Sequence, residues 1–244
     1  MSTAKAPPVL ADLGPFQALA RIAQIFYAPR RVAEKIREHP NWVFPLLFSM
    51  LLSFLVAGVL IGRPEWQQTL QKAIDGSGQK LNELEKVRLL GAMRAMSWVF
   101  FIAAPILGNL FIAGVLWGTT AMLEGQAGFV KVFSLQLHAQ MVSLVPQTVG
   151  LGWILGAGGA NLSEGDAPLP SSLGYFLPSQ GVAPTLRALA TSVDVFTIWY
   201  WVLVIVGLAI VARLPRGRLV LPVAVLGAMG VLMRAAAVLL SANP

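Results

Sequence analysis

Five stretches of about twenty apolar residues constrain the fold of this chain more than any motif in it. An α-helix rises ~1.5 Å per residue, so each stretch is long enough to cross a hydrocarbon core of ~30 Å. Only 12% of the 244 residues are charged, whereas a soluble domain carries about 25%. We therefore expect an all-α membrane protein, a polytopic bundle with five transmembrane helices. The expected spans are residues 42–62, 97–123, 132–157, 192–212 and 220–240.

The rest of the chain is too short for a second large domain. We expect an N-terminal arm, residues 1–40, followed by a membrane domain, residues 41–244. The Lys and Arg residues flank the spans, which argues against a nucleic-acid partner: six precede the first span, and Arg213, Arg216 and Arg218 lie in the short fourth loop. Because cytoplasmic loops are enriched in Lys and Arg, the N-terminus and the fourth loop are predicted to be cytoplasmic. The first loop, which also holds six cations, is the exception.

The N-terminal arm has the pattern of two short helices. Apolar residues, among them Leu19, recur at three- and four-residue steps between Phe16 and Phe26, and Pro29 suits the first turn of a second helix. Basic amphipathic helices lie in the headgroup layer of a membrane. The arm is therefore predicted to lie at the membrane surface, either as a lipid anchor or as a docking site for a cytoplasmic protein. Its basic residues are Arg30, Arg31, Lys35 and Arg37.

Four short motifs follow one another along the chain. Residues 26–32 (Phe-Tyr-Ala-Pro-Arg-Arg-Val) and 38–42 (Glu-His-Pro-Asn-Trp) precede the first span. Residues 124–129 (Glu-Gly-Gln-Ala-Gly-Phe) separate the second and third spans, and residues 194–199 (Asp-Val-Phe-Thr-Ile-Trp) open the fourth. In their order and spacing these motifs resemble bacterial members of the Yip family, the Ypt/Rab-interacting membrane proteins. Residues 12–16 are similar to a cytoplasmic motif of eukaryotic relatives but lack its Tyr.

The resemblance implies a multispanning protein, without known catalysis, that binds partners or organises membrane. It implies membrane lipid and an unidentified protein as partners. It also favours the bacterial inner membrane as the location, with a eukaryotic endomembrane as the alternative.

Polar residues in the third span form one stripe. At ~100° per residue their side chains fall within a sector of ~60°. An isolated amide in hydrocarbon costs several kcal/mol, so the stripe is predicted to face protein or water. It either forms hydrogen bonds between helices or lines a solute path, for which only Asn109 offers a second polar wall. The stripe consists of Gln136, Gln140, Ser143 and Gln147.

Three further polar residues lie in or beside the spans. His138 points away from the stripe and could form a hydrogen bond to a neighbouring helix or, as the sharper alternative, act as an axial cofactor ligand. Asp194 and Arg234 are predicted to pair near the outer leaflet, because burying either charge alone would be costly. The stretch between 158 and 190 is predicted to be an irregular outer cap.

The sequence contains no phosphate-binding loop and no H-E-x-x-H run, and it has only two histidines and no cysteine. We therefore expect no enzyme activity, no metal site and no cofactor. Three hypotheses remain: a membrane scaffold of the Yip type, a small-solute channel or transporter using the polar stripe, and an accessory subunit of an energy-transducing membrane complex.

Overall fold

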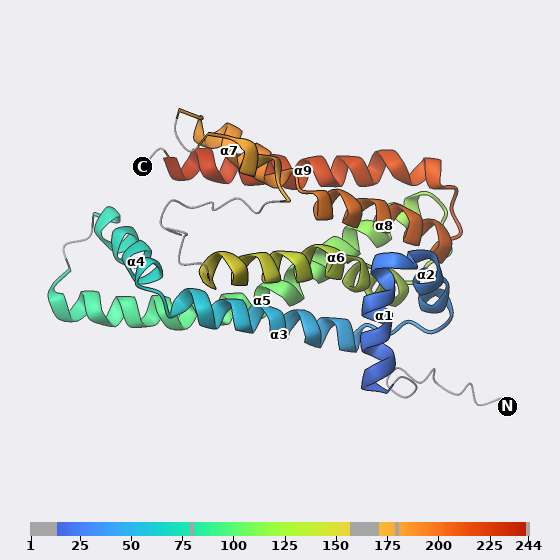
Figure 1. Cartoon of the computed structure of the whole chain (residues 1–244), viewed down its shortest axis with the longest axis horizontal. Coiled ribbons are helices and arrows are strands. Elements are labelled where there is room, and N and C mark those ends of the chain that lie inside the picture. The colour runs from blue at the N-terminus through green and yellow to red at the C-terminus, as the bar shows by residue number, and fades with distance from the viewer. Residues whose placement is uncertain (1–13, 79–80, 157–170, 179–180, 243–244) are drawn as a thin grey trace.

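The computed structural model describes residues 14–78, 81–156, 171–178 and 181–242 (Figure 1). In these ranges the chain is helical, with one isolated β-bridge between Ser172 and Asp194, so the all-α class is confirmed. The elements in chain order are α1 (Pro15–Tyr27), α2 (Pro29–Glu38), α3 (Val43–Ile61), α4 (Pro64–Gly76), α5 (Glu83–Met122), α6 (Phe129–Gly156), η2 (Leu173–Phe176), α7 (Pro184–Ser192), α8 (Val195–Val211) and α9 (Arg216–Ala242).

Three helices of the described chain are long and apolar enough to cross a membrane. They are α3, α5 and the part of α9 from Arg216 to Met233. Helix α8 is apolar but has 17 residues, and α6 carries the polar stripe along its length. The sequence therefore identified the apolar helices, and three of its five spans meet this criterion for crossing a membrane.

Helix α5 is longer than the span expected at 97–123. It begins at Glu83, where the Asn82 side chain accepts a hydrogen bond from the Glu85 amide (2.9 Å) and Glu85 accepts one from the Asn82 amide (2.8 Å). This reciprocal cap starts a helix of 40 residues, about 60 Å long, roughly twice the hydrocarbon thickness. Helix α4 packs beside this extension, and Lys86 forms an ion pair with Asp75 (3.9 Å).

The stretch expected to be an irregular cap is partly helical. Helix α7 begins with Pro184 in its first turn, where the missing N–H costs no hydrogen bond, and η2 forms one further turn. Residues 158–170 of the expected cap lie outside the described residues. The prediction of an irregular cap is therefore wrong for residues 184–190.

Aromatic contacts mark two levels along α5. Trp98, which follows the first 15 residues of α5, packs against Phe54 of α3 with ring centroids 5.3 Å apart. Near the C-terminal end of α5, Trp117 packs against Phe129 of α6 at 6.2 Å. Tryptophan is enriched at membrane interfaces. The two tryptophans are separated by about 28 Å at 1.5 Å per residue, which matches a hydrocarbon core of ~30 Å. Helix α5 continues for 15 residues before Trp98.

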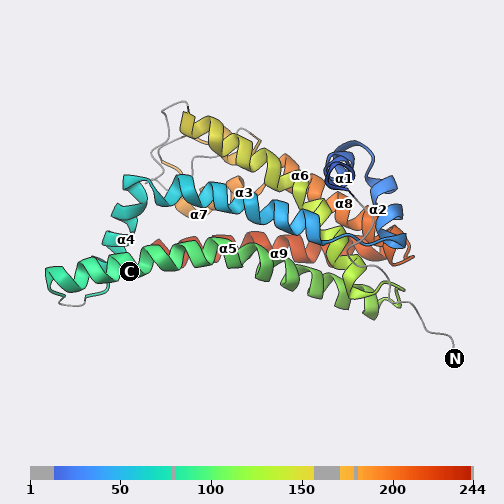
Figure 2. The same ribbon diagram turned by 90° about the horizontal axis from the view of Figure 1, so that it is seen from below.

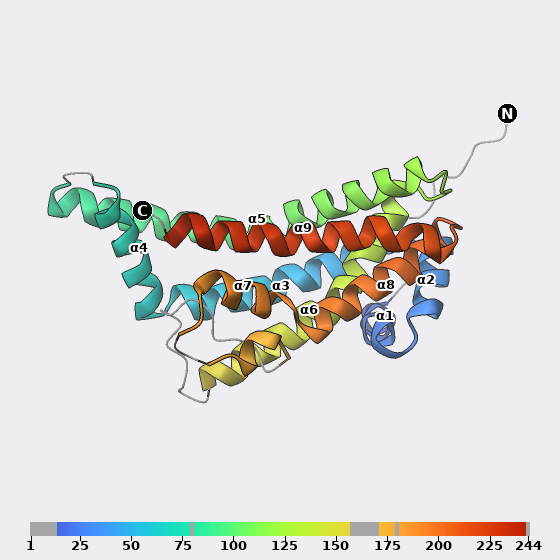
Figure 3. The same cartoon turned by 90° about the horizontal axis from the view of Figure 1, so that it is seen from above.

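The centre of the bundle is formed by α6 and α8. Residues 132–142 of α6 are buried except for Gln140, and Gly207 of α8 packs so closely that a Cβ there would lie 2.8 Å from Leu135 Cδ2. Helices α3, α5 and α9 lie outside them and expose large apolar side chains, such as Phe111 (72%) and Leu221 (72%). Figure 1 shows α3 and α9 on opposite sides of the bundle, so that α3 lies in front in the view from below and α9 in front in the view from above (Figures 2 and 3).

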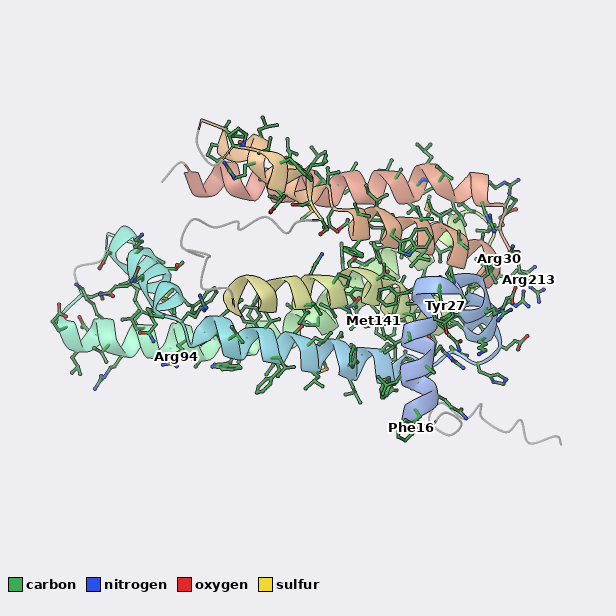
Figure 4. All side chains as sticks on the ribbon, viewed as in Figure 1. Phe16, Tyr27, Arg30, Arg94, Met141 and Arg213 are labelled. Carbon is green, nitrogen blue, oxygen red and sulfur yellow. The ribbon has the colours of Figure 1, made fainter. Side chains whose placement is uncertain are left out.

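Helices α1 and α2 pack across one end of this bundle, against α6 and α8. In α2, Val32, Ala33 and Ile36 are fully buried. In α1 the buried side differs from the expected apolar stripe: Phe16 (86%) and Leu19 (44%) are exposed. Phe16 projects from the free end of α1 (Figure 4). The side of α1 that packs inward consists of Ala18, Arg21, Ile22 and Ile25.

Candidate functional site

Three helices meet at a buried polar cluster, which we define as Gln136, Asn109 and Tyr200. The Tyr200 hydroxyl donates to Gln136 Oε1 (2.6 Å), and Gln136 Nε2 donates to Asn109 Oδ1 over a longer distance (3.4 Å). Asn109 in turn donates to the Pro105 carbonyl (2.6 Å). One amide of α6 is thus bonded to both α8 and α5, so this part of the predicted stripe forms hydrogen bonds between helices.

The other members of the stripe have different surroundings. Ser143 donates to the Phe196 carbonyl of α8 (3.1 Å), a second bond between the central helices. Gln140 Oε1 is buried without a hydrogen-bond partner among the described residues. Gln147 is exposed. The stripe therefore starts inside the bundle and ends at its surface, and its four residues do not share one environment.

His138 lies on the opposite side of α6 and is 1% exposed. Its Nδ1 lies 2.7 Å from the Ser134 carbonyl oxygen. A carbonyl only accepts hydrogen bonds, so Nδ1 carries the proton. Ser134 itself donates to the Asn41 carbonyl, just before α3 (2.9 Å). The His138 side chain thus bonds within α6, whereas the Ser134 side chain links α6 to the residues just before α3.

Asp194 caps the N-terminus of α8. Its Oδ1 accepts from the amides of Phe196 (2.7 Å) and Thr197 (3.2 Å), and its Oδ2 accepts from the Ser171 hydroxyl. These bonds satisfy a carboxylate that is only 5% exposed. The side chain of Arg234, its expected ion-pair partner, lies outside the described residues.

Arg21 is the buried cation of the arm. It is 7% exposed and donates to the His39 carbonyl at the end of α2 (3.3 Å). Burial lowers the pKa of its guanidinium, which still remains charged because arginine titrates so far above neutral pH. This bond draws Arg21 inward and explains why the buried side of α1 is not the purely apolar stripe that its sequence suggested.

Six exposed cations gather at the same end of the bundle, and we call this surface the basic end. Arg30 of α2 and Arg213 of the α8–α9 turn lie close together (Figure 4). Lys35 donates to Gln24 (3.3 Å) and Arg213 to Gln126 (3.3 Å), but no cation of the basic end lies within 4.0 Å of a carboxylate among the described residues. The basic end consists of Arg30, Arg31, Lys35, Arg213, Arg216 and Arg218.

The structure brings together residues that the sequence kept apart. The basic residues of α2 and of the α8–α9 turn lie at one end of the bundle. Arg37, which was expected to belong with them, is half-buried and is not part of the basic end.

Tyr200 was not predicted as a site residue, since nothing in an apolar run identifies the residue that will face a glutamine on another helix. Among the described residues no group of three His, Cys, Asp or Glu side chains is placed to hold a metal.

Most of the chain matches a known protein family. A family model described as the Yip1 domain matches residues 23–236, from α1 to α9. No curated protein and no solved structure matches the chain.

Proposed function

The chain belongs to the Yip1 domain family, and from this premise we propose that it is a non-enzymatic integral membrane protein that engages lipid or protein partners at its cytoplasmic face. The observation that carries the proposal is the basic end. Its cations have no carboxylate partners among the described residues and belong to helices within the family match. A surface with unneutralised charge is suited to binding an anionic partner.

We propose that the five helices of the bundle, α3, α5, α6, α8 and α9, all span the membrane. Helix α8 rises about 25 Å over its 17 residues, close to the lower limit for a span. Helix α6 is more polar than a lipid-facing span, but its polar residues are largely surrounded by α3, α5 and α8. Burial within protein supports a spanning position for α6 because its amides need not face lipid.

The proposed orientation places the basic end in the cytoplasm of a bacterium, with the protein in the inner membrane. Nine cations and three carboxylates lie on α1, α2, the α5–α6 turn, the start of α6 and the α8–α9 turn with its following residues. At the opposite end Arg63, α4, the start of α5 and α7 carry fewer cations, six, together with four carboxylates, two of which pair with Lys86. This asymmetry supports a cytoplasmic N-terminus under the positive-inside rule.

The orientation can be tested by labelling single cysteines, since the natural chain has none. Intact cells carrying Glu34→Cys, Val87→Cys or Leu107→Cys are treated with a membrane-impermeant maleimide. We expect labelling of Val87→Cys on the extension of α5, labelling of Glu34→Cys only after permeabilisation, and none of Leu107→Cys, which lies between the two tryptophan levels. Labelling of Glu34→Cys but not Val87→Cys in intact cells would invert the proposed topology.

Partner engagement can be tested by photo-crosslinking from the two ends. A photoreactive amino acid replaces Glu34 on α2 or, as the matched control, Lys72 on α4; both positions are exposed. We expect a discrete protein or lipid adduct from Glu34 that is absent from Lys72. Equal adducts from both positions, or none from Glu34, would contradict a partner surface at the basic end.

The polar cluster supports this proposal over a solute path. A path needs polar groups that are free to contact solute, whereas Gln136 and Ser143 use theirs to bond neighbouring helices. Only Gln140 and Gln147 of the stripe keep polar atoms available to a solute. No described feature favours an accessory subunit of an energy-transducing complex.

A further inference from the structure

The basic end is assembled from two segments that lie far apart in the sequence. Arg30, Arg31 and Lys35 come from α2, and Arg213, Arg216 and Arg218 come from the α8–α9 turn and the first turn of α9. All six are exposed, and none has a carboxylate partner among the described residues. Like charges held near one another repel, so this arrangement favours a counter-charge from outside the chain.

The turn that carries three of these cations is firmly packed. The backbone N–H of Gln126 donates to the Ala212 carbonyl (2.9 Å), and this bond joins the α5–α6 turn to the α8–α9 turn. Gly125 fits so tightly that an added Cβ would lie 2.9 Å from the Thr120 carbonyl oxygen. Arg213 adopts a left-handed backbone with φ of 57°, and Leu214 is buried beside it. The arginines therefore project from a fixed base and not from a loose loop.

Helix α2 is fixed to the same base. Its buried residues Val32, Ala33 and Ile36 belong to one apolar core with Ala212, Leu214 and Leu219 around the turn. The apolar side of α2 is thus occupied by protein, which leaves its charged side outward. The basic end behaves as one surface because both of its halves share this core.

The position of the surface indicates which kind of anion it meets. The α8–α9 turn connects the ends of two helices that we place in the membrane, so Arg213 and Arg216 lie at the level of the lipid headgroups. Just beyond them, Val220 (49%) and Leu221 (72%) are exposed and apolar. An apolar surface that continues into a cationic one matches the boundary between acyl chains and headgroups.

We propose that the basic end is a binding surface for the phosphate headgroups of anionic phospholipids in the leaflet around it. This inference rests on the proposed membrane orientation and specifies the lipid partner of the same surface. The arginines contact the headgroup phosphates, and the exposed apolar residues of α9 contact the adjoining acyl chains. The shared ligand chemistry is a phosphate, and the position of the surface in the membrane selects the lipid as its source.

The test uses the purified full chain in mild detergent, titrated with dioleoylphosphatidylglycerol or dioleoylphosphatidylcholine, and native mass spectrometry counts the bound lipids. We expect tighter binding of the anionic lipid. The variant Arg213→Gln/Arg216→Gln/Arg218→Gln should lose about tenfold or more of that affinity, because each cation near an anionic surface contributes about fivefold. Binding of the zwitterionic lipid should be unchanged.

The matched control removes three exposed cations from the other end: Lys72→Gln/Arg88→Gln/Arg94→Gln. It changes the net charge equally and should retain the preference for anionic lipid. An Arg→Lys variant at the three turn positions should also retain it, which keeps the test valid if the Gln variant folds poorly. Raising the salt concentration should weaken anionic-lipid binding to the natural chain.

Three results would overturn the inference. The first is an equal loss of affinity in both triple-Gln variants, and the second is equal affinity of the natural chain for the two lipids. The third is competition by inorganic phosphate beyond that of chloride at the same ionic strength, which would indicate a soluble phosphate as the ligand. Since no protein partner is present, these results leave the crosslinking test of the proposed function unaffected.

Discussion

The hydrogen bond between Tyr200 and Gln136 offers the sharpest test of how this bundle is held together. Both residues are at least nine-tenths buried, and the 2.6 Å bond joins the two central helices. Tyr200→Phe removes the donor while keeping the ring. Gln136 then retains only its 3.4 Å bond to Asn109, and its side-chain oxygen is left without a donor.

The expected cost follows from hydrogen bonds measured between helices in membranes. These contribute about 0.6 kcal/mol on average and up to about 1.7 kcal/mol. The Tyr200–Gln136 bond is short and well buried, so we expect Tyr200→Phe to lower the free energy of unfolding by about 1 to 1.7 kcal/mol. Gln136→Leu should cost a similar amount, because it leaves the Tyr200 hydroxyl unpaired.

A double-mutant cycle separates this bond from side effects of each substitution. The free energy of unfolding is measured by titrating the purified protein in mixed micelles with a denaturing detergent, with tryptophan fluorescence as the signal. The double variant Tyr200→Phe/Gln136→Leu should be less destabilised than the sum of the single variants, by about 0.6 to 1.7 kcal/mol. Gln147→Leu, the same substitution at an exposed position of α6, should have little effect.

Additive single effects would refute the reasoning. So would a loss of stability in Gln147→Leu as large as that in Gln136→Leu, since it would show that α6 tolerates no apolar substitution in its stripe regardless of bonding. The solute-path hypothesis makes a different prediction, because it assigns Gln147 to the path and expects an effect on flux there without an effect on stability.

Two further substitutions test the packing of the ends. Gly125→Ala should destabilise the protein by about 1 to 3 kcal/mol, because the added methyl group meets a backbone carbonyl and two buried side chains. Gly128→Ala in the same turn meets nothing within 4 Å and should cost less, since it changes only the residue that precedes α6; thermal unfolding in detergent compares the two. Asp194→Ala should lower the free energy of unfolding by about 0.5 to 2 kcal/mol, because it removes the N-cap of α8. Asp75→Ala, at an exposed position, should cost far less in the same measurement. Equal losses from the two variants would show that Asp194 does not stabilise the protein as a cap.

Hydropathy predicted the apolar helices but not where all of them begin. The span expected from residue 97 is the inner part of α5, which starts at Glu83. The charged residues in this extension lower the hydropathy, so the predicted span ends there. They do not end the helix, because Glu, Lys and Arg are good helix formers. The signal was nonetheless in the sequence, as Asn82 and Glu85 have the spacing of a capping box.

Partners across helices were harder to predict than faces on one helix. The stripe on α6 follows from a 100° period alone, and two of its members do bond to other helices. Which residue completes each bond depends on how α8 is rotated and shifted against α6. That register is set by contacts such as Gly207 against Leu135, which no local pattern encodes.

The arrangement of polarity explains why the outer helices α3, α5 and α9 can expose large apolar side chains. In lipid, exposed apolar side chains cost nothing, so α3, α5 and α9 can face outward, whereas the amides of α6 gain by being enclosed. In water the same exposure would be costly at residues such as Phe111 and Leu221. A central position therefore suits α6 because of its polar residues. Its hydrogen bonds to α8, the other central helix, and to α5 of the outer shell are specific contacts that orient the bundle.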